Sequence, residues 1–315
     1  MRIASVAQGP VLCCNSAMFE GFEDKRVTLS NGLKIRLRTA GSGPAVLLLH
    51  GYPQTSACWH AVAPLLVASG FTVVVPDLRG YGASDKPAST TDHATYSKRE
   101  MAADQVEVMQ QLGHDRFLLA GHDRGARVAH RMTLDHPAAV SAVAVLDIAP
   151  TATMYARTDR AFATGYYHWF FLIQPAPLPE TLIAADPDFY LKSKLAAWGK
   201  SGMAPYHPDA LAEYLQAFRD PACIAATCED YRASAGIDLD HDAADANKKV
   251  QAPLLALWGG KGLVGRLYDV PAVWREKAVD VSGQALPVGH FLPEEAPEET
   301  ADHLIRFFRG VLAET

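Results

Sequence analysis

The sequence predicts an α/β fold in which a mostly parallel, doubly wound sheet carries an inserted helical cap. Short apolar runs alternate with segments of helical spacing in residues 22–150 and again in residues 250–315, as in parallel sheets that helices cover on both faces. The alternation stops in residues 151–249, where aromatic residues and prolines are frequent and helical patches occupy residues 189–198 and 208–218. This stretch is therefore expected to form the cap over the carboxyl ends of the strands, where such sheets bind ligands.

Eight apolar runs predict the strands of the sheet. The first two lie on either side of Asn31 and Gly32, a pair that is typical of the tight turn of a hairpin. Most of the others are continuously apolar, which indicates central parallel strands that are covered on both faces. The runs lie at residues 27–29, 33–37, 45–49, 73–75, 117–120, 140–146, 253–258 and 281–286.

Apolar residues at helical spacing predict three long helices outside the cap, over residues 96–112, 124–135 and 298–312. The first closes at Gly113, because glycine readily takes the left-handed conformation that ends many helices. The second ends before Pro137, since the residue that precedes a proline is pushed out of the helical conformation. Strands that alternate with such helices predict the doubly wound sheet.

The composition excludes several classes of function. Apolar residues make up 49% of the 315 residues, and the formal net charge is −6 with no basic run, so no nucleic-acid partner is expected. No apolar stretch is long enough to span a bilayer, so no membrane partner is expected either. The five cysteines show neither a disulfide framework nor a zinc spacing, and the cytoplasm is the expected location. Residues 1–21 are expected to be a flexible extension, with a signal peptide as the alternative.

The most informative residue is Asp123, which follows the apolar run of residues 117–120 and precedes the helical residues 124–135. Gly121 and Gly125 flank it, and glycine leaves room for a sharp turn. This strand–turn–helix arrangement is typical of the nucleophile elbow of the α/β-hydrolase fold, in which the central residue is usually serine. The alternative is an aspartate that caps the helix.

A carboxylate at this position favours a different reaction from that of a serine. A serine attacks a carbonyl carbon and forms an acyl-enzyme, whereas a carboxylate is a poor nucleophile for acyl transfer. A carboxylate can displace a leaving group from a saturated carbon, which leaves the organic group on the enzyme as an ester. Asp123 therefore indicates cleavage of a carbon–halogen bond or opening of an epoxide, followed by hydrolysis of that ester.

Hydrolysis of the ester needs a general base, because water attacks an ester slowly when unaided. His290 lies after the last predicted strand and before the last helix, where the chain order nucleophile–acid–histidine places the base. A carboxylate must fix the tautomer of this histidine and stabilise its charged form. Asp147 is the candidate, because it follows the strand of residues 140–146 and no acid directly follows the strand of residues 253–258. The alternative is that Asp147 only forms a turn.

Backbone amides are expected to hold the negative charge that develops when the ester carbonyl is attacked. Residues 50–53 follow the strand of residues 45–49, and the loop after this strand supplies one such amide in the hydrolase elbow. The N–H groups of Tyr52 and Arg124 are the predicted oxyanion hole. His50 itself is expected to be structural.

Arg124 and Arg127 lie within four positions of Asp123, at the start of its helix. Residues three apart share a helix face, and two cations at a helix N-terminus oppose the usual preference for acids there. A bound anion would compensate them, and arginine holds a carboxylate through two parallel hydrogen bonds. The pair therefore predicts a substrate with a carboxylate next to the reacting carbon. The alternative is a pair of structural salt bridges to acids of the cap.

These residues give the chain a close resemblance to the fluoroacetate (haloacetate) dehalogenases of the α/β-hydrolase superfamily. The resemblance runs from about residue 22 to residue 308. Its most specific motif is Asp-Arg-Gly-Ala-Arg at residues 123–127, whereas the His-Gly-x-Pro motif of residues 50–53 is shared with many relatives. The segments that carry it are residues 49–55, 121–127, 146–148, 167–169, 228–232 and 289–295.

The resemblance implies the same roles at five positions that the residues themselves indicate. Asp123 is the implied nucleophile, His290 its base and Asp147 the partner of that base. Arg124 and Arg127 are the implied carboxylate clamp.

The resemblance also implies that His168, Trp169 and Tyr231 donate hydrogen bonds to the departing halide. Imidazole N–H, indole N–H and phenol O–H suit this task, because they donate without adding net charge. Without the resemblance, packing within the cap is the simpler interpretation of all three. The reaction needs no cofactor and no metal, and the family's tendency to pair implies a homodimer.

The leading hypothesis is therefore a haloacetate dehalogenase that acts on a small haloacid. The second hypothesis is an epoxide hydrolase with the same three catalytic residues, in which His168 and Tyr231 protonate the epoxide oxygen. An uncharged epoxide would leave both arginines unmatched in a buried pocket, at a cost of several kcal/mol. A non-catalytic ligand-binding relative and a serine esterase are further alternatives, although neither Ser84 nor Ser141 lies in an elbow.

Overall fold

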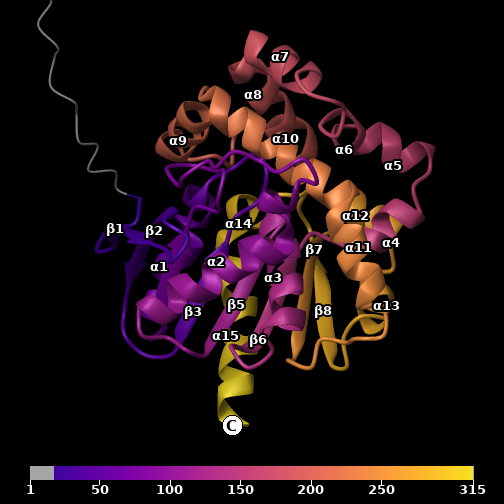
Figure 1. Ribbon diagram of the computed structural model, residues 1–315. Helices are drawn as coiled ribbons and strands as arrows, with labels where there is room; N and C mark the ends of the chain where they lie inside the picture. The colour runs from indigo at the N-terminus through magenta and orange to yellow at the C-terminus, as the bar shows by residue number, and fades with distance from the viewer. Residues whose placement is uncertain (1–17, 315) are drawn as a thin grey trace, which may run out of the picture.

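The computed structural model describes residues 18–314, in which eight strands form one sheet (Figure 1). The strands are β1 (Glu23–Thr28), β2 (Lys34–Ala40), β3 (Ala45–Leu49), β4 (Thr72–Pro76), β5 (Phe117–His122), β6 (Val140–Leu146), β7 (Leu254–Gly259) and β8 (Val281–Leu286). Their order is β1-β2-β4-β3-β5-β6-β7-β8. β1 and β2 form the predicted antiparallel hairpin, β2 pairs antiparallel with β4, and all other pairs are parallel. The predicted mostly parallel sheet is confirmed.

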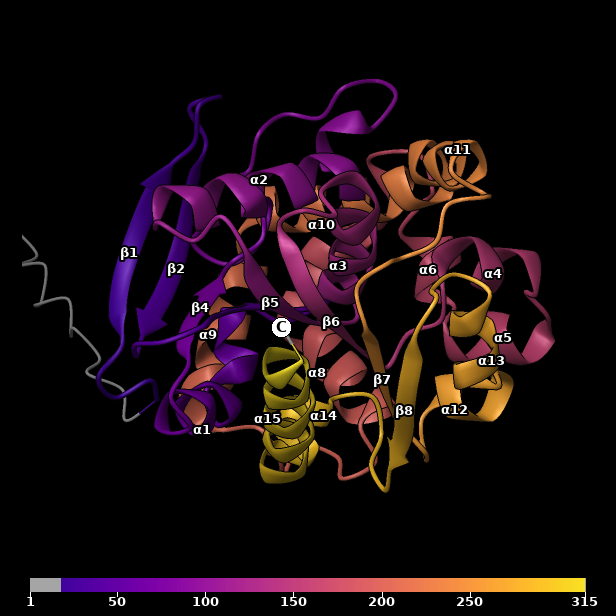
Figure 2. The ribbon, with the colours of Figure 1, turned by 90° about the horizontal axis from the view of Figure 1, so that it is seen from below.

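Helices cover both faces of this sheet. Those outside the cap region are η1 (Ser56–Trp59), α1 (Val62–Ala68), η2 (Ala94–Tyr96), α2 (Lys98–Gln111), α3 (Arg124–Asp135), α12 (Leu263–Leu267), α13 (Val270–Arg275), α14 (Leu292–Glu295) and α15 (Pro297–Ala313). α2 and α3 pack side by side on one face, and α1 and α15 pack together on the other (Figure 2). The doubly wound arrangement that the alternation of strands and helices predicts is therefore present.

Eight further helices lie between β6 and β7 in the chain. They are α4 (Thr151–Ala156), α5 (Arg160–Gly165), α6 (His168–Phe171), α7 (Leu178–Ala185), α8 (Pro187–Trp198), α9 (Pro208–Phe218), α10 (Pro221–Ala235) and α11 (Ile237–Ala244). Figure 1 shows α5 to α10 across one end of the sheet. This is the end at which β5 leads into α3, since Asp230 of α10 binds Arg124 of α3. The division of the chain into a core domain and a cap domain stays a prediction.

The boundaries of the long elements agree closely with the sequence-based expectations. Residues 45–49, 140–146 and 281–286 are strands with the predicted bounds, and residues 124–135 form the predicted helix. The short helices α1, α12, α13 and α14 could not be predicted, because four to seven residues contain too few turns for a periodic pattern.

The end of the predicted flexible extension differs from the expectation. Residues 1–17 lie outside the residues that the structure describes. Met18 and Phe19 are buried against the core, and the guanidinium of Arg38 lies 4.6 Å from the centroid of the Phe19 ring. The extension predicted over residues 1–21 is therefore wrong for these two residues, because their side chains pack.

The turn between β5 and α3 has almost no free space. Asp123 has φ +47° and ψ −114°, a backbone conformation that costs a residue other than glycine about 1–3 kcal/mol. A Cβ atom at Gly121 would lie 2.5 Å from the carbonyl oxygen of Gly125, and one at Gly125 would lie 2.4 Å from that of His50. The two glycines thus let β5, α3 and the loop after β3 meet beneath Asp123, as the elbow requires.

Gly125→Ala is expected to lower the free energy of unfolding by about 1–3 kcal/mol, because its methyl group would meet backbone oxygens. Gly310→Ala in α15 is the matched control, since nothing lies within 4 Å of a Cβ there. Inside a helix alanine is favoured over glycine by about 0.5–1 kcal/mol, so the control should be slightly more stable than the wild type. Urea unfolding measures both values. Equal stability of the two variants would contradict the tight packing of the turn.

Candidate active site

Asp123 is 7% exposed and has one carboxylate oxygen held by the backbone. The N–H of Tyr52 donates a hydrogen bond of 2.9 Å to its Oδ1. The other oxygen, Oδ2, lies 3.8 Å from Nε2 of His290. The fixed Oδ1 leaves Oδ2, beside the imidazole, as the oxygen that can attack a substrate.

The imidazole ring of His290, a residue between β8 and α14, is held in place at Nδ1, the nitrogen that does not face Asp123. Its Nδ1 lies 2.6 Å from Oδ2 of Asp147, and the N–H of Gly259 donates to Oδ1 of Asp147 at 2.9 Å. Nε2 of His122 donates to the backbone oxygen of His290 at 2.7 Å. The structure therefore brings together the three predicted catalytic residues, with Asp147 on the Nδ1 side of the imidazole and Asp123 on the Nε2 side.

Burial and charge together set the protonation of these residues. Burial opposes ionisation of Asp123, but the charges of His290 and Arg127 outweigh it and lower the pKa of this carboxyl. Burial also opposes the charged form of His290, while the hydrogen bond that His290 donates to Asp147 and the charges of Asp147 and Asp123 raise its pKa. At neutral pH the site thus contains an ionised carboxylate next to a histidine that an acid orients, which is what nucleophilic attack followed by base catalysis requires.

The predicted oxyanion hole of the Tyr52 and Arg124 N–H groups stays a prediction. The N–H of Tyr52 bonds to the carboxylate of Asp123, but no hydrogen bond among the described residues joins the N–H of Arg124 to it. His50 accepts a hydrogen bond of 3.0 Å from the N–H of Leu78 at Nε2, and its Nδ1 lies 3.1 Å from a backbone oxygen. Both ring nitrogens of His50 are therefore occupied, in agreement with its expected structural role.

Arg124 differs from the predicted clamp, because a carboxylate of the chain already holds most of its guanidinium. The residue is fully buried, and Asp230 accepts hydrogen bonds from its Nε at 3.0 Å and its Nη2 at 2.6 Å. Ser234 accepts a further hydrogen bond from Nη2, whereas Nη1 has no partner. A ligand can therefore receive hydrogen bonds only from Nη1, and the two parallel bonds that the sequence predicts are not available at Arg124.

Asp230 balances more than one cation. The ammonium group of Lys98, at the start of α2, also bonds to its carboxylate, and the hydroxyl of Tyr81 donates to it at 2.6 Å. Burial opposes ionisation of Asp230, but the charges of Arg124 and Lys98 outweigh it and lower its pKa. These contacts join α10 of the cap to the N-terminal ends of α2 and α3. The alternative expectation of a salt bridge to a cap acid is therefore correct for Arg124.

Arg127 is a buried cation without a counter-ion. It is 3% exposed, and its Nη1 donates to the backbone oxygen of Ala149 at 3.2 Å and to the hydroxyl of Thr151 at 2.9 Å, which are both neutral. Its Nε has no partner, and no carboxylate within residues 18–314 forms an ion pair with it. Burial and the charge of Arg124 lower its pKa. An uncompensated buried charge is costly, so this position favours a bound anion.

His168 and Trp169 of α6 and Tyr231 of α10 lie together above the two arginines. The ring centroid of Tyr231 lies 5.4 Å from that of His168 and 6.3 Å from that of Trp169. The guanidinium of Arg124 lies 4.1 Å from the Tyr231 ring, and that of Arg127 lies 4.7 Å from the Trp169 ring. Nδ1 of His168 and the hydroxyl of Tyr231 are buried without partners. Burial holds the pKa of His168 well below its usual value, so the imidazole is neutral.

Two tyrosines beside the site could not be predicted as part of it. The ring centroid of Tyr166 lies 6.2 Å from that of His290 and 5.4 Å from that of His168. The ring of Tyr155 lies 5.0 Å from that of Trp169. Both hydroxyls are buried without a hydrogen bond. No spacing rule distinguishes such residues from tyrosines that only pack, so the sequence contains no signal for them.

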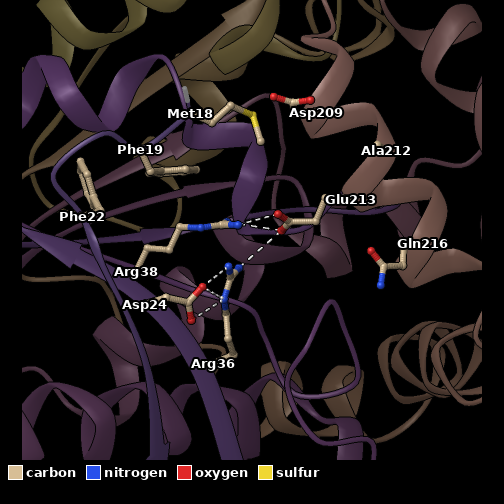
Figure 3. Close-up of a pocket in the computed structure, with 10 residues that line it drawn as sticks. All are labelled: Met18, Phe19, Phe22, Asp24, Arg36, Arg38, Asp209, Ala212, Glu213 and Gln216. Carbon is tan, nitrogen blue, oxygen red and sulfur yellow. Dashed lines mark hydrogen bonds and ion pairs between the residues drawn. The ribbon is translucent and has the colours of Figure 1, made fainter. Parts of the chain in front are cut away.

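A separate cavity of about 360 Å³ lies between the first hairpin and α9 (Figure 3). Its lining includes none of the predicted site residues. Arg36 and Arg38 are both paired there, Arg36 with Asp24 and Glu213, and Arg38 with Glu213. The charges of this cavity are balanced by the chain itself, so it is not a candidate active site.

No group of three or more His, Cys, Asp and Glu side chains within residues 18–314 is arranged to hold a metal ion. None of the helices in this range combines the length and the apolar character that crossing a bilayer requires.

The fold and the elbow define the class of protein. Residues 44–297 match the family model of the α/β hydrolase fold, and the chain belongs to this family. Within it, the chain is 48% identical over 290 residues to the fluoroacetate dehalogenase of Burkholderia sp, an alignment that covers 92% of this chain and 95% of that relative. The resemblance on which the sequence analysis draws is therefore confirmed.

Other relatives are similar over nearly as much of the chain. The soluble epoxide hydrolase of Corynebacterium sp. (strain C12) is 34% identical over 288 residues, which cover 88% of this chain and 94% of the relative. A solved structure from Nostoc sp PCC 7120, provisionally described as an α/β hydrolase, has a TM-score of 0.91 and 59% identity over 92% of this chain and 99% of its own. Similarity thus includes both a dehalogenase and an epoxide hydrolase, and the charges of the site must distinguish these functions.

Asp230→Asn is expected to lower the free energy of unfolding by about 3–5 kcal/mol, because it leaves Arg124 and Lys98 buried beside an uncharged amide. Asp188→Asn is the control, since Asp188 pairs with Arg219 at the surface and such pairs contribute less than about 1 kcal/mol. Urea unfolding of both variants measures the difference. A loss for Asp230→Asn no larger than that of the control would mean that the buried ion pairs do not hold α10 in place.

Proposed function

We propose that this protein is a hydrolytic haloacetate dehalogenase that converts fluoroacetate or chloroacetate to glycolate and halide. The observation that carries the proposal is the buried guanidinium of Arg127, which forms no ion pair within residues 18–314 and whose charge helps to lower the pKa of Asp123. Such a cation favours a substrate whose own carboxylate is bound beside the attacking oxygen. The identity to the Burkholderia fluoroacetate dehalogenase supports the same reaction. The cytoplasmic location and the homodimer stay predictions.

In the first step, the substrate carboxylate binds to Nε of Arg127 and Nη1 of Arg124, which are both buried without partners. Oδ2 of Asp123 attacks the carbon that bears the halogen, because Oδ1 is held by the N–H of Tyr52. A carbon–oxygen bond forms while the carbon–halogen bond breaks, and the halide leaves with the bonding electron pair. In-line attack inverts the configuration at a substituted carbon.

Departure of fluoride depends on hydrogen bonds that strengthen as its charge develops. His168, Trp169 and Tyr231 can supply these bonds from neutral groups. The unpartnered Nδ1 of His168 and hydroxyl of Tyr231 support this role, since preorganised donors stabilise a developing charge without having to reorient.

In the second step, His290 takes a proton from a water molecule that attacks the carbonyl carbon of the ester. The water oxygen enters the carboxyl group of Asp123, and glycolate leaves with the oxygen that attacked first. This oxygen takes the proton from the imidazolium of His290, and the carboxyl of Asp123 releases its own proton to solvent. Formation of the ester removes the charge of Asp123, one of the causes that raise the pKa of His290. The histidine therefore becomes neutral more readily at the stage when it must accept a proton. Asp147 then stabilises the imidazolium, and the N–H of Tyr52 holds the oxyanion.

Epoxide hydrolysis is the second candidate, because the chain is similar to the Corynebacterium epoxide hydrolase. The same three catalytic residues would serve, and His168 and Tyr231 would protonate the epoxide oxygen. Arg124 does not argue against this function, since Asp230 neutralises it. Arg127 does, because an uncharged epoxide would leave its buried charge unmatched, at a cost of several kcal/mol.

Release of halide from fluoroacetate and chloroacetate, measured with ion-selective electrodes, tests the proposal. The wild-type protein is expected to release halide continuously, and Asp123→Ala is expected to release none. His290→Gln is expected to release about one equivalent and then stop, because the ester forms but is not hydrolysed. Mass spectrometry of the His290→Gln protein should then find the ester on Asp123. Diol formation from a neutral epoxide that is faster than haloacetate turnover would favour the second candidate.

Arg127→Met is expected to lower kcat/KM for chloroacetate about 10- to 150-fold, because a hydrogen bond to a charged group contributes about 1.5–3 kcal/mol. Chloroacetamide is the control substrate, since it has the same reacting carbon and no carboxylate. Its kcat/KM should change little in the variant, and initial rates with both substrates provide the comparison. Equal losses for the two substrates would contradict the role of Arg127 in anion binding.

A further inference from the structure

A second cavity, of about 280 Å³, extends to His290 between α5, α8 and α12. Its lining begins with the exposed side chains of Lys200 and Arg266 and ends at the buried rings of Tyr166 and His290. It is therefore a route between solvent and the base of the proposed reaction.

The charges of this cavity are of one sign. Its lining contains Lys194, Lys200 and Arg266 and no carboxylate, and none of these cations forms an ion pair within residues 18–314. Glu295 lies nearby, since its Oε2 accepts a hydrogen bond of 2.9 Å from the N–H of Lys200, but it does not line the cavity. In the cavity of Figure 3, by contrast, both arginines are paired with carboxylates.

Lys194 is the most unusual of the three cations, because it is 3% exposed. Its Nζ lies 3.9 Å from the ring centroid of Tyr167 and 4.6 Å from that of Tyr190, and it donates a hydrogen bond to the hydroxyl of Tyr167. Burial lowers the pKa of Lys194 to about 8, so the group is mainly charged at neutral pH. Its charge also contributes, after burial, to the lowered pKa of His168. Lys194 thus acts electrostatically on the proposed halide site.

The net charge of the whole protein opposes the approach of an anionic substrate. With a formal net charge of −6, the protein as a whole repels a small anion. Cations that line a cleft with low-dielectric walls concentrate the field there, and they raise the local concentration of an anionic substrate.

We propose that this cavity is an anion-binding vestibule, in which Lys194 holds a small monocarboxylate before the substrate passes His290 and reaches Arg127. The inference rests on the proposed function, because it takes the haloacid as the anion that must enter. Lys200 and Arg266 draw the anion to the opening, and Lys194 binds it inside.

The dependence of kcat/KM on ionic strength tests the vestibule with chloroacetate. Lys194→Met is expected to lower kcat/KM about 3- to 10-fold at low ionic strength and to flatten its decrease with added salt. Lys192→Met on the same helix is the control, because Lys192 is exposed and lies beside Asp188. Lys192→Met should leave kcat/KM and its dependence on salt unchanged. If Lys194→Met does not fold, Arg266→Gln at the opening of the cavity provides the same test, with a smaller expected change in kcat/KM.

Quenching of tryptophan fluorescence gives a second readout that needs no turnover. Trp198 lines the vestibule, and the difference between the wild type and Trp198→Phe isolates its emission. Iodide, an anion, should quench this emission at least about twofold less in Lys194→Met, whereas neutral acrylamide should quench it equally in both proteins.

The two readouts separate the vestibule from the proposed function. Absence of halide release from every haloacetate, with the iodide effect intact, would reject the function and leave an anion-binding cavity. Normal halide release, with neither the salt dependence nor the iodide quenching changed by Lys194→Met, would overturn the vestibule and leave the function.

Discussion

The carboxylate of Asp230 sets the charge balance on which the site depends. Arg124, Arg127 and Lys98 place three positive charges near the N-terminal ends of α2 and α3, where the helix dipoles already oppose cations. Asp230 binds Arg124 and Lys98, which leaves Arg127 as the cation that a ligand must neutralise. In the proposed function, a single unmatched cation fits a substrate with one carboxylate, and the ion pairs of Asp230 are what leave Arg127 as that cation.

The same ion pair also fixes distances in the site. Asp230 and Tyr231 are neighbours on α10, so the contact that holds Arg124 also places the Tyr231 hydroxyl relative to the elbow. Asp123 lies next to Arg124 in a strained turn that the surrounding backbone encloses. Helix α10 and the turn of Asp123 are thus joined by the buried hydrogen bonds between Asp230 and Arg124. Such rigidity is what allows hydrogen-bond donors to be in place before charge develops on a leaving group.

The parts of the site that follow from chain order could be predicted from the sequence. Asp123, Asp147 and His290 each follow a predicted strand, and parallel strands bring their carboxyl ends to one edge of a sheet. The partner of Arg124 could not be predicted, because residue spacing does not say which cap acid folds over it. The available signal was that an arginine at the start of this helix, if buried, requires an acidic partner. The sequence contains no signal for the role of Lys194, since its burial among aromatic rings arises only from tertiary packing.

The most direct test of the central claim is to follow the oxygen atoms through a single turnover in water enriched in heavy oxygen. If Oδ2 of Asp123 bonds to the carbon of the substrate, the first glycolate contains an unlabelled hydroxyl oxygen, and the label appears in the carboxylate of Asp123. Mass spectrometry of the product and of the peptide that contains Asp123 measures both. A labelled hydroxyl in the first glycolate, with no label in the protein, would mean that water attacks the carbon directly and would contradict the ester intermediate.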